Sequence, residues 1–170
     1  MLGSIDRSSA RVGAVLGLGL GLLLAAGFAY SNLGPSAAHP TSDDSVAVLG
    51  GYVVMAAAFA TFGFVVRRWL PSPRNCAIAG AVAGVVALLV VAVAIGVINN
   101  VWLSTVARQP DKIYGLAHDH MFHTMRAYLN GQLALGLVVL PPVAAAGCAL
   151  LTGMGALVAE HAPGGGRLRS

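Results

Sequence analysis

The sequence predicts an all-α fold: an integral membrane bundle of four antiparallel transmembrane helices, with an amphipathic extracytoplasmic helix before the fourth. Composition supports this prediction first, because 57% of the 170 residues are hydrophobic and only 9% are charged. A soluble domain carries about 25% charged residues, so most of this surface is expected to face lipid. We expect one membrane domain over residues 1–170.

Four runs without a charged residue are long enough to cross a bilayer. A helix needs about 20 apolar residues to cross ~30 Å of hydrocarbon, and it satisfies its own backbone hydrogen bonds there. The predicted spans cover residues 12–33, 46–66, 76–98 and 133–158. The first span also suits a signal peptide cleaved near Ala38, but its apolar core exceeds the roughly 7–15 residues of such signals. We therefore expect a retained helix.

Basic residues predict the orientation of these spans. If the N-terminus is cytoplasmic, seven basic residues lie inside and three lie outside. The inner residues are Arg7, Arg11, Arg67, Arg68, Arg74, Arg167 and Arg169, and the outer ones are Arg108, Lys112 and Arg126. Such a bias predicts a multi-pass protein of the cell (plasma) membrane with both termini cytoplasmic. Because topology accounts for the basic residues, we expect no nucleic-acid partner.

Small residues spaced by four predict the helix contact faces. Lipid competes equally for large apolar side chains, so membrane helices associate where small residues let their backbones approach. The predicted packing residues are Gly13, Gly17 and Gly21 in the first span, Gly80 and Gly84 in the third, and Ala145, Ala149 and Gly153 in the fourth. Their partner faces can belong to the same chain or to another. Pro141 and Pro142 should kink the fourth span.

None of the four predicted spans contains an Asp, Glu, Lys, Arg or His. Proton relays, ion pathways and coupled transporters normally use such residues at depth. A proton-coupled transporter and a haem held by two histidines between the spans are therefore not expected. Any chemistry should lie in the outer segment, residues 108–131.

The outer segment is predicted to form an amphipathic helix that contains the sequence HDHMFH at 118–123. On such a helix Asp119, His120 and His123 would share one face and could hold one ion. His39, with Asp43 and Asp44 in the first outer loop, could complete a copper or zinc site. The spacing matches no metal motif such as HExxH. A polar face toward lipid headgroups is the favoured interpretation, and pH sensing by the histidines is a further alternative.

These features favour a non-enzymatic accessory subunit or scaffold that packs through small-residue helix faces. Its expected partners are the lipid bilayer and either a second copy of the chain or another membrane protein. No cofactor is predicted under this interpretation. The alternative is an extracytoplasmic protein that binds copper or zinc through the HDHMFH segment.

Overall fold

A computed structural model describes residues 7–33 and 44–162, with side chains described from residue 53 onward in the second range. These residues form helices and no strand: α1 (Arg7–Leu33), α2 (Asp44–Val66), α3 (Pro73–Val101), α4 (Leu103–Val106), α5 (Pro110–His118) and α6 (Met125–His161). Three helices, α1, α3 and α6, are long and apolar enough to cross a membrane. The described apolar part of α2, Val53–Val66, is shorter.

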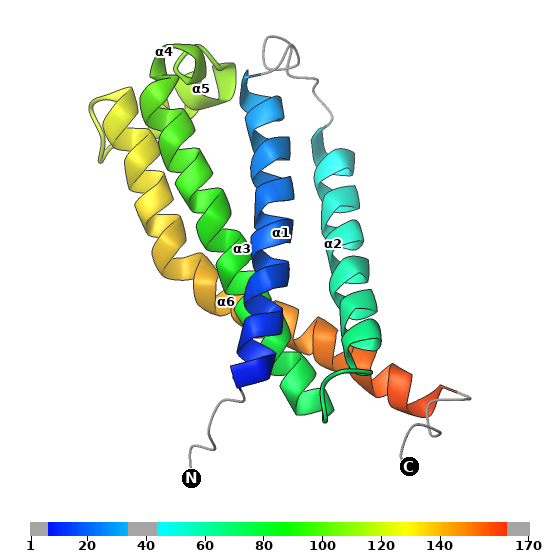
Figure 1. The fold of residues 1–170 in the computed structure, drawn as a ribbon. Helices are drawn as coiled ribbons and strands as arrows, with labels where there is room; N and C mark the ends of the chain where they lie inside the picture. Colours follow the sequence, from blue (N-terminus) through cyan, green and yellow to red (C-terminus); the bar gives the residue numbers. More distant parts are fainter. Residues whose placement is uncertain (1–6, 34–43, 163–170) are drawn as a thin grey trace.

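Helix α3 lies at the centre of the arrangement (Figure 1), with α1 on one side and α6 on another. Helix α6 changes direction about midway along its length (Figure 1), where Pro141 and Pro142 lie inside it. Proline lacks the backbone N–H and its ring clashes with the carbonyl four residues earlier, so it bends a helix. The second half of α6 crosses α3 and reaches α2.

The contact between α1 and α3 is a close approach of two backbones. Gly13, Gly17 and Gly21 are buried on one face of α1. A Cβ added to Gly17 would lie 2.5 Å from the carbonyl oxygen of Ala83 and 2.9 Å from its Cα. The contact therefore has no room for a side chain, and it depends on van der Waals packing between backbones. The α3 residues that meet the three glycines are Ala79, Ala83 and Ala87, together with Val82, Val86 and Val90.

Helix α6 meets α3 through a second small-residue face. A Cβ on Gly84 would lie 2.7 Å from the Cys148 Sγ atom. The α6 residues that face Gly80 and Gly84 are Ala144, Cys148 and Thr152. The predicted Ala145, Ala149 and Gly153 lie one position further along α6 and are half-buried, as are Ala144 and Cys148. A Cβ on Gly153 would contact the Ala77 side chain of α3 at 3.5 Å. Residues 144–146 are all alanine, so residue size alone could not distinguish the two adjacent faces.

Thr152 also lies where α6 meets α2. Its backbone abuts Gly63 of α2, and three residues further along α6 Gly155 abuts the backbone of Ala60. Thr152 itself is 0% exposed. Thr152 therefore lies between α2 and α3, with Gly63 against its backbone and Gly80 against its side chain.

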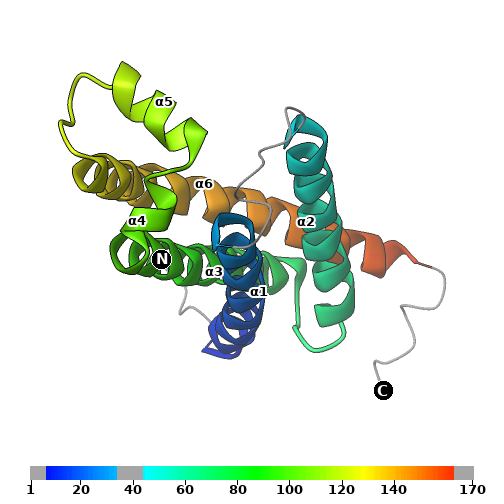
Figure 2. The same cartoon turned by 90° about the horizontal axis from the view of Figure 1, so that it is seen from above.

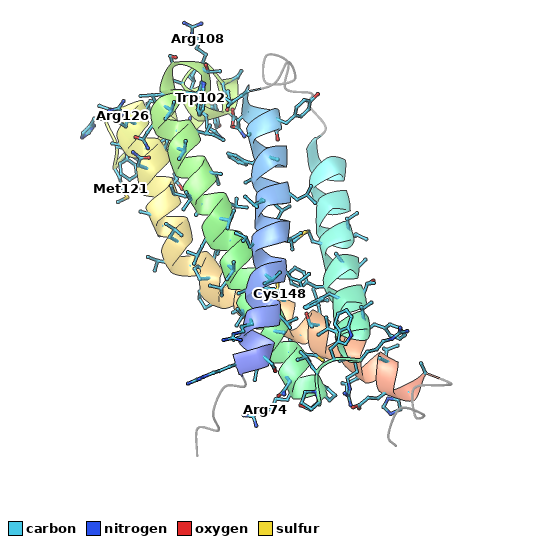
Figure 3. The ribbon with its side chains drawn as sticks, viewed as in Figure 1. Arg74, Trp102, Arg108, Met121, Arg126 and Cys148 are labelled. Atoms are coloured by element: carbon cyan, nitrogen blue, oxygen red, sulfur yellow. The ribbon has the colours of Figure 1, made fainter. Side chains whose placement is uncertain are left out.

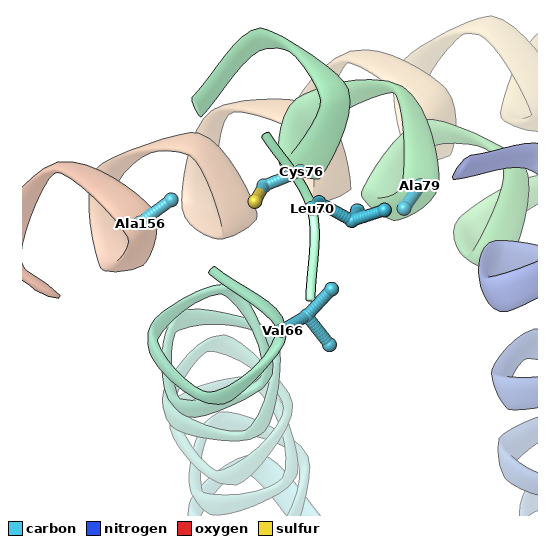
Figure 4. Packing of buried hydrophobic residues seen from close by; sticks show 5 residues of the cluster. All are labelled: Val66, Leu70, Cys76, Ala79 and Ala156. Carbon is cyan, nitrogen blue, oxygen red and sulfur yellow. The ribbon is translucent and has the colours of Figure 1, made fainter. Parts of the chain in front are cut away.

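The end of the molecule that carries the first turn of α1 is held together by a salt bridge and an apolar cluster. Arg67 Nη2 lies 2.6 Å from Glu160 Oε1, and Arg67 Nη1 donates to the Leu70 carbonyl at 2.7 Å. The turn after α2 is thereby tied to the last turns of α6. Figure 4 shows the cluster beneath it, which consists of Val66, Leu70, Cys76, Ala79 and Ala156.

Candidate functional site

Amide side chains join the helices at the opposite end of the molecule. Asn100 of α3 and Asn130 of α6 exchange two hydrogen bonds, at 3.1 and 3.2 Å. Gln109 Nε2 donates to the backbone carbonyl of Asn32 in α1 at 3.1 Å. The Asn100–Asn130 pair joins α3 to α6, and the Gln109 bond joins α1 to the start of α5. Figure 3 places Trp102, Arg108 and Arg126 at this end. Arg74 lies at the other end.

The outer segment is not the single helix that the sequence predicted. Helix α5 ends at His118, residues 119–124 are not helical, and α6 begins at Met125. Asp119 has an extended backbone, and its Oδ1 accepts from the Met121 N–H at 2.7 Å. Such local side-chain bonds compete with the helix. Thr124 then starts α6 as its N-cap, accepting from the Ala127 N–H, and α6 begins eight residues before the predicted span at 133.

The break separates the residues that a continuous helix would have aligned. Asp119 is engaged with Met121, while His118 Nδ1 lies 2.9 Å from the Tyr114 carbonyl and its ring stacks on Tyr114 at 4.0 Å. His120 and His123 are exposed in the non-helical stretch. In the described part of the chain, no three His, Cys, Asp or Glu residues gather as a metal site would require.

The rest of the proposed ligand set cannot be placed. His39 and Asp43 lie outside the described residues, and the side chain of Asp44, at the start of α2, is also not described. The copper or zinc site therefore stays a prediction.

Residues 119–124 fold back against α6 instead. Phe122 packs against Gly131, inside α6, and meets the Tyr128 ring edge-on at 6.3 Å. Gly115 of α5 also abuts the Tyr128 hydroxyl. Figure 2 shows α5 alongside α6 at this end of the molecule. Gly131 therefore provides space for the Phe122 ring inside α6.

A cavity of about 250 Å³ lies below this polar layer, between α1, α3 and α6. Its walls are mostly apolar, and α3 and α6 supply most of them. Four polar side chains line it: Asn32, Asn99, Lys112 and Gln132. The site is thus apolar along its length and has amides and one cation near the end where α5 lies.

A second open space, of about 320 Å³, separates α1 from α2. These two helices are not among the main packed pairs of the fold, which are α1 with α3, α3 with α6, and α2 with α6. Val15, Leu16 and Leu23 of α1 face Phe59 and Phe62 of α2 across the space. Gly19 of α1 also lines it, and nothing lies within 4 Å of a Cβ built there. We refer to this space as the α1–α2 groove.

Comparison of the chain with protein-family models, with curated proteins and with solved structures gives no match. The class of the protein therefore follows from its own structure. In the described ranges, 7–33 and 44–162, the regular secondary structure is helical and three helices are long and apolar enough to cross a membrane, which is compatible with a protein embedded in a membrane.

Sequence reasoning pointed to the histidines and gave little weight to the amides. Asn99 is one of the polar residues that line the cavity. In the sequence it is visible only as one of two adjacent asparagines at the end of an apolar run. These two adjacent amides, directly after the predicted span 76–98, were the only sequence feature that pointed to a polar site there. Lys112 and Gln132 gave no such signal, because each becomes part of the cavity only when α5 and α6 pack beside α3.

Proposed function

We propose that the chain is a four-span protein of the plasma membrane that acts, without chemistry of its own, as an accessory subunit or scaffold for another membrane protein. The α1–α2 groove is the feature that supports this role. It is apolar, open along one side and bounded by two helices that do not close on each other. The partner we propose for it is a transmembrane helix of another protein.

The internal packing supports the choice of this groove over the glycine faces. Gly13, Gly17 and Gly21 are already covered by α3, and Gly63 and Gly80 by α6. These faces hold the chain's own helices together and leave no surface for a partner. The groove instead has a glycine, Gly19, next to open space, which would let a partner backbone approach closely.

Charge placement supports the proposed orientation. Arg7 and Arg11 lie in the first turns of α1, and Arg67, Arg68 and Arg74 lie at the same end of the bundle as the start of α1. The opposite end has Arg108 and Arg126, and α5 with Lys112 lies at the same end. A five-to-three bias among the described residues favours a cytoplasmic location for the end with the first turn of α1.

A pair of glycine variants tests the groove. Gly19→Leu should fill the groove without disturbing the fold, since nothing lies within 4 Å of a Cβ at that position. Gly27→Leu is the matched control, because it has the same open surroundings on the same helix and does not line the groove. Tagged chains would be purified from native membranes in mild detergent, and co-purifying proteins would be quantified by mass spectrometry.

We expect one membrane protein to be recovered with the wild type and with Gly27→Leu, and to be reduced at least tenfold with Gly19→Leu. The proposal fails if Gly19→Leu recovers the same protein in the same amount. It also fails if the wild type recovers no partner and is monomeric in the same detergent.

A further inference from the structure

The cavity between α1, α3 and α6 has the shape of a site for one extended apolar chain. Its α3 wall runs from Leu88 to Asn99, a separation of about 16 Å at the helical rise of 1.5 Å per residue. One leaflet contributes half of a hydrocarbon core that is about 30 Å thick. The cavity therefore has the length of a single leaflet, with Asn99 near headgroup depth and Leu88 and Leu140 near the midplane.

The apolar wall opposite α3 comes from the first half of α6. Leu133, Leu137 and Leu140 line it, and Gly136 widens it. A Cβ built on Gly136 would meet only the Leu140 side chain, at an ordinary 3.6 Å. The α3–α6 contact is tight where glycines face Cys148 and Thr152, and it is looser here, where Gly96 meets only the Leu133 side chain, at 3.4 Å.

Asn99 distinguishes a specific binding site from an apolar surface that bulk lipid merely covers. The residue is 6% exposed and lines the cavity. No described residue hydrogen-bonds its amide, whereas its neighbour Asn100 bonds both Gly96 and Asn130. Among the described residues only Ser9 and Thr152 have fully buried polar side-chain atoms without a partner, so the Asn99 amide still reaches the cavity space. An occupant that is apolar at this point would leave the amide without a hydrogen bond, at a cost in free energy. A ligand oxygen in the cavity would remove that cost.

A cation lines the same cavity. Lys112 of α5 also lines the cavity, and its ammonium group is 2.7 Å from Asp111 Oδ2. The Asp111 side chain is 63% exposed, and such exposed pairs are weak. The lysine can therefore also bind an anion that enters beside Asn99. A buried amide and an ammonium group at one end of an apolar channel complement the ester and phosphate groups of a lipid.

We propose that this cavity binds one glycerophospholipid. One acyl chain lies between α3 and α6, an oxygen of its ester or phosphate group accepts from the Asn99 amide, and its phosphate interacts with Lys112. The site uses the membrane placement proposed above, but not the α1–α2 groove. Its occupant would separate α3 from the first half of α6 where those helices have no glycine-to-backbone contact.

Lipid titration of the purified full-length chain tests this site. The protein would be delipidated in mild detergent and titrated with phosphatidylglycerol, and bound lipid would be counted by native mass spectrometry. Gly136→Leu places a side chain in the cavity. Gly147→Leu is its control on the same helix, because nothing lies within 4 Å of a Cβ there and the residue does not line the cavity.

We expect the wild type and Gly147→Leu to bind one phosphatidylglycerol at least tenfold more tightly than any further lipid. Gly136→Leu should lose that first, tight binding event. Equal titration curves for the wild type and Gly136→Leu would overturn the proposal, as would a wild type without a distinct first event. Neither outcome bears on the Gly19→Leu experiment, which probes a different surface.

Asn99→Leu separates ligand binding from a purely structural role and remains informative if Gly136→Leu does not fold. A lost hydrogen bond to a lipid oxygen should weaken the first binding event on the order of tenfold. If the amide has no ligand, its replacement by leucine should raise the melting temperature and leave lipid affinity unchanged, which contradicts the proposal. Lys112→Gln should reduce the preference for phosphatidylglycerol over phosphatidylcholine, and inorganic phosphate alone should not compete.

Discussion

At Gly17 the backbones of α1 and α3 are so close that a methyl group has no space. The Cβ of an alanine there would lie 2.5 Å from the Ala83 carbonyl oxygen, well inside van der Waals contact. Gly27, on the same helix, has nothing within 4 Å of the same position. Replacing glycine by alanine should therefore change the free energy of unfolding differently at Gly17 and at Gly27.

Gly17→Ala should lower the free energy of unfolding by about 1–3 kcal/mol, the usual cost of overpacking a well-packed contact. Gly27→Ala should leave it unchanged or raise it by up to about 1 kcal/mol, because alanine is the better helix former. Unfolding in mixed micelles by increasing SDS, followed by circular dichroism, measures both. Equal destabilisation by the two variants would contradict the packing described for α1 and α3.

Thr152 gives a second prediction at the scale of one side chain. The residue is fully buried between α2, α3 and α6, and its hydroxyl has no hydrogen-bond partner among the described residues. Thr152→Val keeps the shape and removes the unpaired group, so the free energy of unfolding should rise by about 1 kcal/mol. The exposed Thr61 of α2 supplies the control Thr61→Val, which should have little effect. A less stable Thr152→Val would show that the hydroxyl is bonded.

The sequence pattern identified helix contact residues best where they are glycines, and worst where they are small polar or sulfur-containing residues. Three glycines spaced by four could be recognised from the sequence alone, because they leave a groove in the helix surface wherever it packs. Thr152 and Cys148 could not be recognised in this way. Their importance comes from the glycines opposite them on α2 and α3, and these pairings between distant residues are not contained in local spacing.

At the scale of elements, the bend of α6 decides which helices become neighbours. Its first half lies along α3 and its second half reaches α2, so a straight α6 could not make both contacts as they stand. Replacing Pro141 and Pro142 together by alanine restores the missing N–H groups and relieves the ring clash. The straightened helix should carry Glu160 away from Arg67.

Cysteines introduced by Arg67→Cys and Glu160→Cys, joined by a short thiol-reactive crosslinker, report this separation. We expect crosslinking to fall several-fold when both prolines are alanine. Pro110→Ala, at the start of α5 and outside the apolar spans, is the control and should leave the yield unchanged. An undiminished yield in the double variant would mean that packing, and not the prolines, sets the bend.

The predicted outer helix shows how a local hydrogen bond can override an amphipathic pattern. Counting at 100° per residue placed Asp119, His120 and His123 on one face, but this count assumes an unbroken helix. The Asp119 side chain bonds the Met121 N–H and Thr124 begins a new helix. Asp side chains favour such bonds to the backbone N–H two residues later, and Thr is favoured at helix N-caps. The preferences of Asp119 and Thr124 for such local bonds were visible in the sequence. The sequence did not show that these bonds would interrupt the helix that the amphipathic periodicity predicted.

For the molecule as a whole, orientation in the membrane is the property that a reporter can test. Alkaline phosphatase fused after Ser170 should be inactive, because it would remain in the cytoplasm, and a fluorescent protein at the same position should fluoresce. Phosphatase fused after Gly115, in α5, should be active outside. The opposite pattern would reverse the proposed orientation. Activity of both phosphatase fusions would contradict the proposed single crossing by α6 between the two fusion points.

The three helices that are long and apolar enough to cross a membrane could be recognised from the sequence. Long uncharged runs can be accommodated only as helices surrounded by apolar material, and this constraint is local, so α1, α3 and α6 could be recognised without tertiary information. Tertiary structure decided how the helices are paired, where α6 bends and where open space remains. The α1–α2 groove and the cavity at Asn99 both arise from residues far apart in the chain, and their geometry depends on packing between helices that no single segment specifies.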